Sequence, residues 1–330
     1  MDSRSKTLTS LKTTNGQNTT DEMEILKSLV SSFFSSDLPS SNPDLLHIRQ
    51  KAADLIDKQQ SSPPPLTEQE FKLAVYAMKP NKAPAKDGIC TEHIQFYLPE
   101  IGKRLKIIMQ ACLDQQYFPN TWKEAKVLIL PKPGKSNYED PSSYRPVSLL
   151  PVIGKILEKI ILSRLESISD EENWLSGNQH GFRKGKSTVT VLEVLITHIR
   201  RAFIKKANTK CVLLDIKGAF DNAWHPSIIC KLKEKHCPSY LINLIASFLH
   251  HRTASLKMFD SQYEAQIQKG CPQGSIFSPF LWNLIIDEAL RETLPKGIQI
   301  QAYADDLVIC KTGTNKKTSN AASNQHVMPW

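Results

Sequence analysis

The chain has 330 residues, of which 40% are hydrophobic and 23% charged, and its formal net charge is +9 at pH 7. This composition is typical of a globular protein long enough for one large domain or two lobes. No apolar run approaches the roughly 18–20 residues of a membrane span, which argues against a membrane-spanning helix, and we expect no membrane partner. The basic excess suits a phosphate-rich partner, although basicity alone does not separate nucleic acid from an anionic membrane.

The cysteines and the N-terminus indicate an intracellular protein. Seven cysteines are scattered along the sequence without any CxxC pair, which argues against a disulfide framework and against a structural zinc site. The polar N-terminus has no apolar core of a signal peptide. We therefore expect localisation in the cytoplasm or the nucleus, without secretion.

The first 65 residues are predicted to be a disordered or linker region with short helices. Residues 1–20 are rich in Ser, Thr, Asn and Lys, a composition typical of disorder. The triple proline at 63–65 is predicted to be a stiff linker. Thr67 and Glu70 then form the capping-box pattern that opens a helix.

Regular patterns follow between residues 66 and 310. Helical spacing of apolar residues predicts helices over residues 101–112, 153–168, 188–204, 226–235, 240–250 and 275–290. Apolar runs predict buried strands over 125–130 and 211–216, a hairpin over 254–268 and two strands over 299–310. The mixed order favours an α+β or α/β fold over a helical bundle or a sandwich. The abruptly polar residues 311–330 are predicted to form an unstructured tail.

Three carboxylates are the candidate metal ligands. Asp215 ends the apolar run 211–214, and Asp305 and Asp306 lie together between two apolar segments. The alternative interpretation is structural, because aspartates commonly cap or occupy turns. Burial of two adjacent carboxylates without a cation would cost on the order of several kcal/mol per ion, and oxygen ligands favour a hard cation such as Mg²⁺. Two cations about 3.5–4 Å apart could clamp the oxygens of a phosphoryl transfer.

Two Gly-rich segments precede predicted helices. In one of them, Gln273 could contact a templating base pair, although an ordinary turn with a serine cap is the simpler interpretation. The other segment, 179–188, is not a P-loop, because three residues rather than four separate its first glycine from Gly-Lys-Ser. Its basic side chains could contact a nucleic-acid backbone; they belong to Arg183, Lys184 and Lys186.

Lys132 and Arg145 flank a basic, turn-rich stretch that is predicted to be a hairpin or a loop. Cations there could grip a triphosphate, and arginine can bind phosphate in a bidentate way. A solvated basic loop is the alternative interpretation of the same residues.

The order of these segments along the chain is more specific than any one motif alone. Between residues 68 and 310 the sequence contains, in order, KAPAKDGI, YRPVSLLPVIGKILEKIIL, QHGFRKGKST, VLLDIKGAFDNAWHP, GCPQGSIFSPFLWN and YADDLVI. In this order they closely resemble the reverse transcriptases of non-LTR, LINE-type retrotransposons. The resemblance implies a reverse transcriptase domain over residues 66–310. Its α+β fold would comprise the fingers and part of the palm of a right-hand polymerase, incomplete at the C-terminus.

The resemblance also implies roles for the candidate acids and for one aromatic residue. Asp215, Asp305 and Asp306 match the catalytic aspartates of the family, which bind two Mg²⁺ ions, with Mn²⁺ as a substitute. Phe220 falls at the position that excludes the ribonucleotide 2′-OH. These matches imply an RNA-directed DNA polymerase with an RNA template, a DNA primer or target, and dNTPs. The primer 3′-OH would attack the α-phosphorus of the dNTP, a transfer that depends on positioning and electrostatics.

Three further matches concern the bound nucleotide. Gln273 corresponds to the glutamine of the family's PQG block, and Lys132 and Arg145 correspond to fingers residues that contact the incoming triphosphate. The resemblance therefore implies that these three residues bind the nucleotide.

The sequence also departs from the family pattern. Ala85-Lys86 stand where the family usually has Gly-Pro, and the pattern ends just after Cys310, before a thumb. No endonuclease domain precedes the polymerase segment, and the strand at 307–310 is expected to leave a free edge. A truncated, catalytically weak or inactive nucleic-acid-binding remnant is therefore the second hypothesis. A P-loop NTPase fails on motif spacing, and Phe220 argues against an RNA-directed RNA polymerase.

Overall fold

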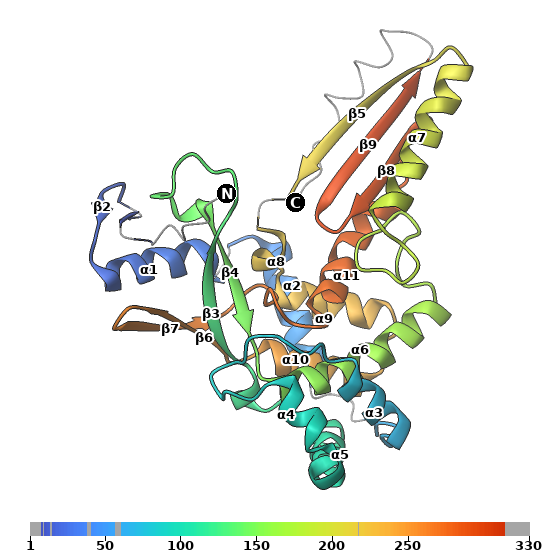
Figure 1. Ribbon diagram of the computed structural model, residues 1–330. Coiled ribbons are helices and arrows are strands. Elements are labelled where there is room, and N and C mark those ends of the chain that lie inside the picture. Colours follow the sequence, from blue (N-terminus) through green and yellow to red (C-terminus); the bar gives the residue numbers. More distant parts are fainter. Residues whose placement is uncertain are drawn as a thin grey trace. The chain divides into compact units, whose positions relative to one another are not determined.

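The structure is a computed structural model that describes residues 8, 10–13, 15–37, 41–56, 61–216 and 218–313. The chain divides into two compact units (Figure 1). Unit 1 comprises Met1–Ile168 with Phe220–Ser278, and unit 2 comprises Ser169–Ala219 with Pro279–Trp330. Within the described residues, no helix combines the length and the apolar character that a membrane crossing requires.

Unit 1 is built on a four-stranded mixed sheet in the order β4-β3-β6-β7. Strand β3 pairs antiparallel with β4 and parallel with β6, and β6 forms a hairpin with β7. Apolar and polar residues alternate at the start of β3, so that Ala125 and Val127 are buried while Lys126 is exposed. The strands span Glu124–Pro131 (β3), Tyr144–Leu149 (β4), Arg252–Met258 (β6) and Ser261–Ile267 (β7).

Helix α1, Glu22–Phe33, packs against this sheet. Its buried residues Ile25, Leu26 and Leu29 join the core formed by the strands, because their spacing places them on one helical face. Asp21 caps the helix by accepting a hydrogen bond from the Glu24 N–H. Two short strands precede the helix, Leu11–Lys12 (β1) and Asn18–Thr19 (β2). The described part of residues 1–20 therefore contains a small ladder where the sequence predicts disorder; residues 1–7, 9 and 14 lie outside the described residues.

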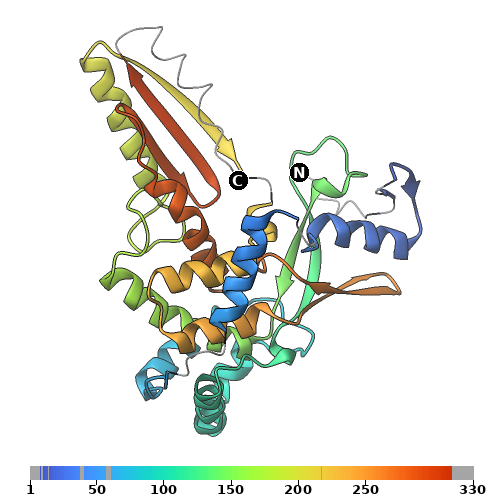
Figure 2. The same ribbon diagram turned by 180° about the vertical axis from the view of Figure 1, so that it is seen from behind.

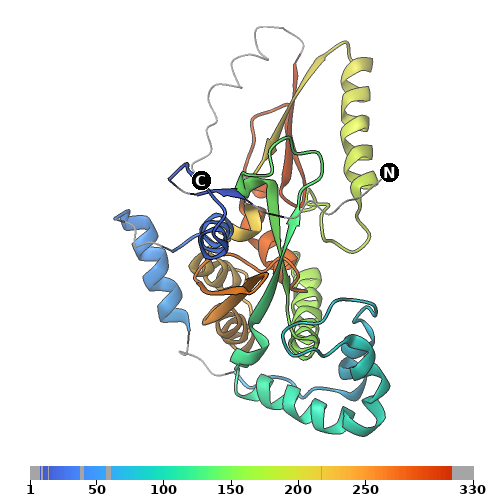
Figure 3. The ribbon, with the colours of Figure 1, turned by 60° about the vertical axis from the view of Figure 1, so that its left-hand side comes forward.

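The other helices of unit 1 form two groups. Helices α3, α4 and α5, drawn from blue to teal in Figure 3, pack consecutively. Helix α2 lies beside α9 in the view of Figure 2, and α10 is almost entirely buried. Thr67 accepts a hydrogen bond from the Glu70 N–H at 3.0 Å, which confirms the predicted start of α3. The bounds are Pro43–Leu55 (α2), Glu68–Tyr76 (α3), Thr91–Phe96 (α4), Leu98–Asp114 (α5), His225–Glu234 (α9) and Ser239–Leu249 (α10).

Helices α6 and α8 each cross a boundary between the two units along the chain, and two 3₁₀ turns lie in unit 1. Helix α6, Val152–Glu171, presents the predicted apolar stripe, of which Ile156, Ile160 and Ile161 are fully buried. Single 3₁₀ turns occur at Asn120–Trp122 and Pro141–Ser143, and the short helix α8 spans Ala219–Asn222.

Unit 2 is built on a three-stranded antiparallel sheet in the order β5-β9-β8, whose strands lie side by side in Figure 1. Helix α7 begins at Thr188, as the sequence predicts, and the Ser187 side chain accepts a hydrogen bond from the Thr190 N–H. The elements are α7 (Thr188–Ile204), β5 (Asn208–Asp215), α11 (Ser278–Arg291), β8 (Ile298–Tyr303) and β9 (Asp306–Gly313).

The sheet of unit 2 corrects two expectations. Strand β9 lies between β5 and β8, so the predicted free edge at 307–310 is wrong; its neighbour is β5. Strand β5 was expected to be buried, yet Leu213 is 80% exposed and the other apolar residues of its end are exposed too. Of the predicted tail 311–330, the first three residues belong to β9, and residues 314–330 lie outside the described residues.

Candidate active site

The acidic turn lies in a tight hairpin between β8 and β9. Tyr303 pairs with Asp306 in the antiparallel register, which leaves Ala304 and Asp305 as the two turn residues. Ala304 has φ 58°, a left-handed conformation that the first central residue of a tight hairpin turn adopts when it is of the primed type. The hairpin therefore presents two consecutive carboxylates at the end of the sheet.

The third candidate carboxylate lies directly across the ladder. Asp215, the last residue of β5, is the register partner of Asp306, the first residue of β9. Side chains of directly opposed residues in an antiparallel pair lie on one face, with Cβ atoms about 4.5–5.5 Å apart. The fold thus brings together acids separated by ninety residues of sequence. Asp215 and Asp306 are exposed, and Asp305 is half-buried.

The three acids share one electrostatic environment. Burial raises the pKa of Asp305 above its usual value, and the negative charges of Asp306 and Asp215 raise this pKa further. A bound cation would relieve this repulsion, and carboxylate oxygens are the donors that hard cations prefer. Among the described residues, however, no three His, Cys, Asp or Glu side chains converge closely enough to form a metal site. The donor types and the register fit a divalent cation, while the side chains do not converge.

Gln179 holds the acidic turn in place. Its side-chain Nε2 donates to the Ala304 carbonyl at 3.1 Å, and its Oε1 accepts from the Ala304 N–H at 3.0 Å. The same Oε1 accepts from the Gly181 N–H at 2.8 Å. Gln179 is 1% exposed, so these bonds satisfy a buried amide and the backbone of the turn together.

The segment around Gln179 approaches the turn very closely. Gln179 forms a parallel bridge with Ala302, and a Cβ atom added to Gly181 would overlap the backbone of Ala304. Trp282 of α11 donates its Nε1–H to the Ala304 carbonyl at 3.3 Å. Glycine at 181 is therefore a steric requirement of the approach between the loop and the hairpin.

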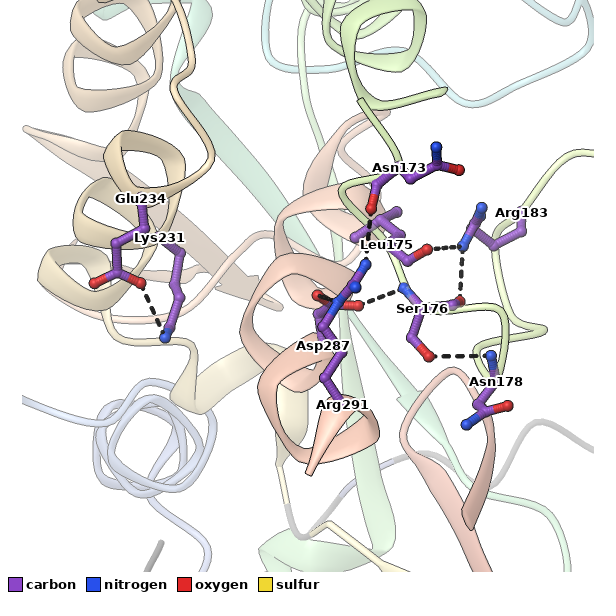
Figure 4. Close-up of polar contacts among 9 residues, drawn as sticks. All are labelled: Asn173, Leu175, Ser176, Asn178, Arg183, Lys231, Glu234, Asp287 and Arg291. Atoms are coloured by element: carbon purple, nitrogen blue, oxygen red, sulfur yellow. Dashed lines mark hydrogen bonds and ion pairs between the residues drawn. The ribbon is translucent and has the colours of Figure 1, made fainter. Parts of the chain in front are cut away.

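The predicted nucleic-acid contacts Arg183 and Lys186 have partners within unit 2. Arg183 donates to the carbonyls of Leu175 and Ser176 (Figure 4). Lys186 donates to the carbonyls of Gly177 and Gln179. These two cations therefore fasten the loop that carries Gln179, while Lys184 is exposed.

A buried carboxylate on α11 also holds this loop in place. Asp287 accepts from the Ser176 N–H and from Arg291 Nε, the latter at 2.6 Å (Figure 4). Arg291 also donates to the Asn173 carbonyl at 2.8 Å. Asp287 is 2% exposed, so the loop is anchored to α11 by charge-assisted bonds in a buried environment.

Gln273 and its partner belong to unit 1. Gln273 Nε2 donates to both carboxylate oxygens of Asp221, at 3.1 and 3.2 Å, and its carbonyl accepts from the Ser148 N–H. Burial raises the pKa of Asp221 to about 6, and the Gln273 bond and the Lys132 charge oppose that rise. The side chain of Gln273 is thus oriented by an acid that sequence reasoning did not single out.

The backbone of Phe220 is hydrogen-bonded to the segment that precedes Gln273. The Phe220 carbonyl accepts from the Cys271 N–H at 2.8 Å, and the Ala223 carbonyl accepts from the Gly270 N–H at 2.8 Å. A Cβ atom at Gly270 would lie 2.6 Å from the Asp221 carbonyl oxygen, and Gly270 has φ 85°. The backbone contact requires glycine at position 270. It holds the backbone of Phe220 beside the segment that carries Gln273.

Lys132 and Arg145 lie at the β3–β4 end of unit 1. Lys132 follows β3 and donates Nζ to the Ser142 carbonyl at 3.0 Å, whereas Arg145 is exposed on β4, where it pairs in register with Leu130. The stretch between the strands is a loop that includes one 3₁₀ turn, and β4 itself was not predicted from the sequence.

Three functional candidates were missed by sequence reasoning: Gln179, Gly181 and Asp221. The first two stand in a Gly-rich block whose position beside the acidic turn depends on pairing between distant segments. Asp221 follows Phe220 in the sequence, and its adjacency to that residue was the available signal.

Comparisons with known proteins identify the family. The sequence model described as "Reverse transcriptase (RNA-dependent DNA polymerase)" matches residues 130–327, which is more than half of the chain. The chain therefore belongs to the reverse transcriptase family.

Individual relatives agree with this assignment. The chain is 33% identical over 251 residues to "Probable RNA-directed DNA polymerase from transposon BS" of Drosophila melanogaster, covering 74% of this chain and 28% of that protein. It is 32% identical over 267 residues to "RNA-directed DNA polymerase from mobile element jockey" of the same organism, covering 78% and 28%. It is 32% identical over 258 residues to the "Retrovirus-related Pol polyprotein from type-1 retrotransposable element R1" of Bradysia coprophila, covering 78% and 25%. The aligned part of the chain thus spans about a quarter of each of these relatives.

Proposed function

We propose that this chain carries out RNA-directed DNA synthesis as part of a LINE-type retrotransposon polymerase. The observation that carries the proposal is the β5–β9 register, which sets Asp215 opposite Asp306 and next to Asp305. The family membership and the relatives' names support the reaction class.

The three aspartates would hold two Mg²⁺ ions, or Mn²⁺ in their place. Bound cations of this kind activate an attacking oxygen and stabilise the leaving group of a phosphoryl transfer. The chain's contribution is to fix the carboxylates on two paired strands and a two-residue turn. Gln179 holds the Ala304 backbone, so that the turn does not move when the acids are charged.

The unit 1 residues would bind the incoming dNTP. Lys132 and Arg145 supply positive charge for the triphosphate, and Arg145 is exposed on β4 and so accessible to it. Phe220 would exclude the 2′-OH of a ribonucleotide by steric contact. Gln273, oriented by Asp221, would contact the base pair or the backbone beside it.

The template and primer would be held by backbone phosphate contacts. Lys184 is the exposed cation of its loop and the best placed of the three to bind phosphate. Arg183 and Lys186 would act chiefly by fastening the loop, since both bind carbonyl oxygens. The proposed fold is that of polymerase fingers and part of the palm over residues 66–310, and the proposed site of action is intracellular.

A nucleic-acid-binding remnant is the second candidate. The observation that favours it is the lack, within the described residues, of three converging metal-ligand side chains. In this case the basic surface would hold RNA while the aspartates would not support turnover.

Primer extension on a short RNA template with a DNA primer, dNTPs and Mg²⁺ tests the proposal. We expect extension by the wild-type chain and a loss of at least about a hundredfold in Asp305→Asn/Asp306→Asn, the order of effect of removing electrostatic stabilisation from a transfer reaction. RNA binding without extension in both proteins would support the remnant instead. Extension that survives the double substitution would refute the site assignment.

A further inference from the structure

Two cysteines face each other across the β5–β9 ladder. Cys211 of β5 and Cys310 of β9 are register partners, and their Sγ atoms lie 2.7 Å apart. Both are free thiols, although they are separated by 99 residues of sequence. Disulfide formation requires the two sulfurs to approach to about 2.05 Å from Cβ atoms about 3.8 Å apart. Cβ atoms of directly opposed cross-strand residues lie about 4.5–5.5 Å apart, so closing the bond requires the two cysteines to approach by roughly 1 Å.

The accessibility of the two thiols differs in a way that suits stepwise oxidation. Of the seven cysteines, all within the described residues, Cys211 alone is exposed, while Cys310 is 2% exposed. Burial and the neighbouring Cys211 raise the pKa of Cys310 to about 12, and its burial keeps a dissolved oxidant away from its sulfur. An oxidant from solution therefore reaches Cys211 first.

We propose that Cys211 and Cys310 are an oxidation site that closes to an intramolecular disulfide when the chain meets a peroxide. The Cys211 thiol is oxidised to a sulfenic acid while hydrogen peroxide is reduced to one water. The Cys310 sulfur then attacks the Cys211 sulfur and the Cys310 thiol proton passes to the departing hydroxyl group, which forms the S–S bond and releases a second water. A thiol reductant reverses the reaction by exchange.

The cross-link would join the two strands that carry the acids. Side chains alternate along a strand, so Cys211 lies on the same face of β5 as Asp215, and Cys310 on the same face of β9 as Asp306. The disulfide would fix the register that sets Asp215 opposite Asp306. Any effect on catalysis rests on the proposed function, whereas formation of the disulfide does not.

Peptide mapping of the peroxide-treated full chain tests this inference. The reduced protein is treated with hydrogen peroxide, quenched with catalase, alkylated and digested with trypsin without reduction. We expect the peptides 211–217 and 297–311 to appear as one species with a mass two hydrogen atoms below their sum. The free thiol count should fall from seven to five, and amides of β5 should exchange hydrogen more slowly in the oxidised protein.

Matched variants decide the interpretation. Cys211→Ser, at an exposed position, and Cys310→Ser should each abolish the linked species, whereas Cys237→Ser, at a buried position of unit 1, should retain it. The inference is overturned if Cys211 is recovered as a sulfinic or sulfonic acid without the link. It is also overturned if Cys211 forms disulfides between chains, or if the link forms equally in urea. None of these outcomes depends on polymerase activity, so a failure here is distinguishable from a failure of the proposed function.

Discussion

Asp221 shows how one half-buried acid couples the geometry of a site to pH. Both oxygens of its carboxylate accept hydrogen bonds from Gln273 Nε2, yet burial raises the pKa of Asp221 from 3.8 to about 6. In the folded protein Asp221 therefore holds its proton more tightly than in the unfolded chain. Its contribution to stability must fall as the pH rises from about 4 to about 6, and above that range the charged form is buried at a cost.

We expect Asp221→Asn to remove this pH dependence. The difference in unfolding free energy between variant and wild type should shift in favour of the variant by about 2–3 kcal/mol between pH 4 and pH 7.5. Urea unfolding at both pH values measures the shift. Asp140→Asn is the matched control, because hydrogen bonds to Ser142 lower the pKa of Asp140, so its stabilising charge persists across this window. An equal, flat difference for both variants would contradict the burial of Asp221.

Gln179 is predicted to act on catalysis through the turn that it holds. Gln179→Leu would leave the Ala304 N–H without its partner, which costs about 1–3 kcal/mol for a buried group. We expect primer extension to fall at least about tenfold while the protein stays folded, with the loss in kcat rather than in KM for dNTP. Gln95→Leu, which removes two hydrogen bonds to the carbonyls of Val75 and Met78 in unit 1, is the control. Equal extension by the two variants would remove the positioning role of Gln179.

At the scale of elements, hydrogen bonds join the loop 178–181 and the β8–β9 hairpin into one structural unit. The loop bonds to Ala302 on both sides, through the Asn178 carbonyl and the His180 N–H, and Gly181 fits against the turn. We predict that Gly181→Ala forces the hairpin away from the loop, which would speed hydrogen exchange at residues 302–307 and reduce primer extension. Gly177→Ala is the control, since no atom lies within 4 Å of a Cβ atom at that glycine. Unchanged exchange in Gly181→Ala would show that the turn adapts to the added methyl group.

Local signals predicted the individual elements of this region well. Thr67 is a helix cap in the structure as in the sequence, because capping depends on residues three positions apart, and α7 begins at its predicted residue Thr188. The strands β5, β8 and β9 lie within a few residues of their predicted ends, since apolar runs bounded by polar residues mark them. These features are set by neighbours in sequence, which a pattern can capture.

Features that depend on distant pairing could not be predicted in the same way. The contact between Gln179 and Ala304 joins residues 125 positions apart, and the sequence offers no local mark of it. The exposure of Leu213 also contradicts the expectation of a buried strand, because burial of a strand's side chains depends on which distant elements cover the faces of the sheet. Strand β4 was missed for a related reason: it contains Pro146, which is tolerated because β4 lies at the sheet edge.

For the whole molecule, the net charge of +9 predicts a salt-dependent association with nucleic acid. Each phosphate neutralised releases counterions, so the affinity for single-stranded RNA should fall steeply between about 50 and 200 mM salt. Lys184→Ala should reduce the slope of log affinity against log salt by roughly one contact, and Lys296→Ala, outside the predicted contacts, should leave it unchanged. Fluorescence anisotropy with a labelled RNA measures both slopes. An affinity independent of salt would contradict phosphate binding.

The central claim is that Asp215, Asp305 and Asp306 form one centre for divalent cations. Titration of the chain with Mn²⁺, followed by electron paramagnetic resonance, measures this directly and does not depend on turnover. We predict Mn²⁺ binding that Mg²⁺ displaces, and that weakens at least about tenfold in Asp215→Asn and in Asp306→Asn while Asp260→Asn, at an exposed turn, leaves it unchanged. Equal Mn²⁺ binding by the wild type and all three variants would contradict the claim.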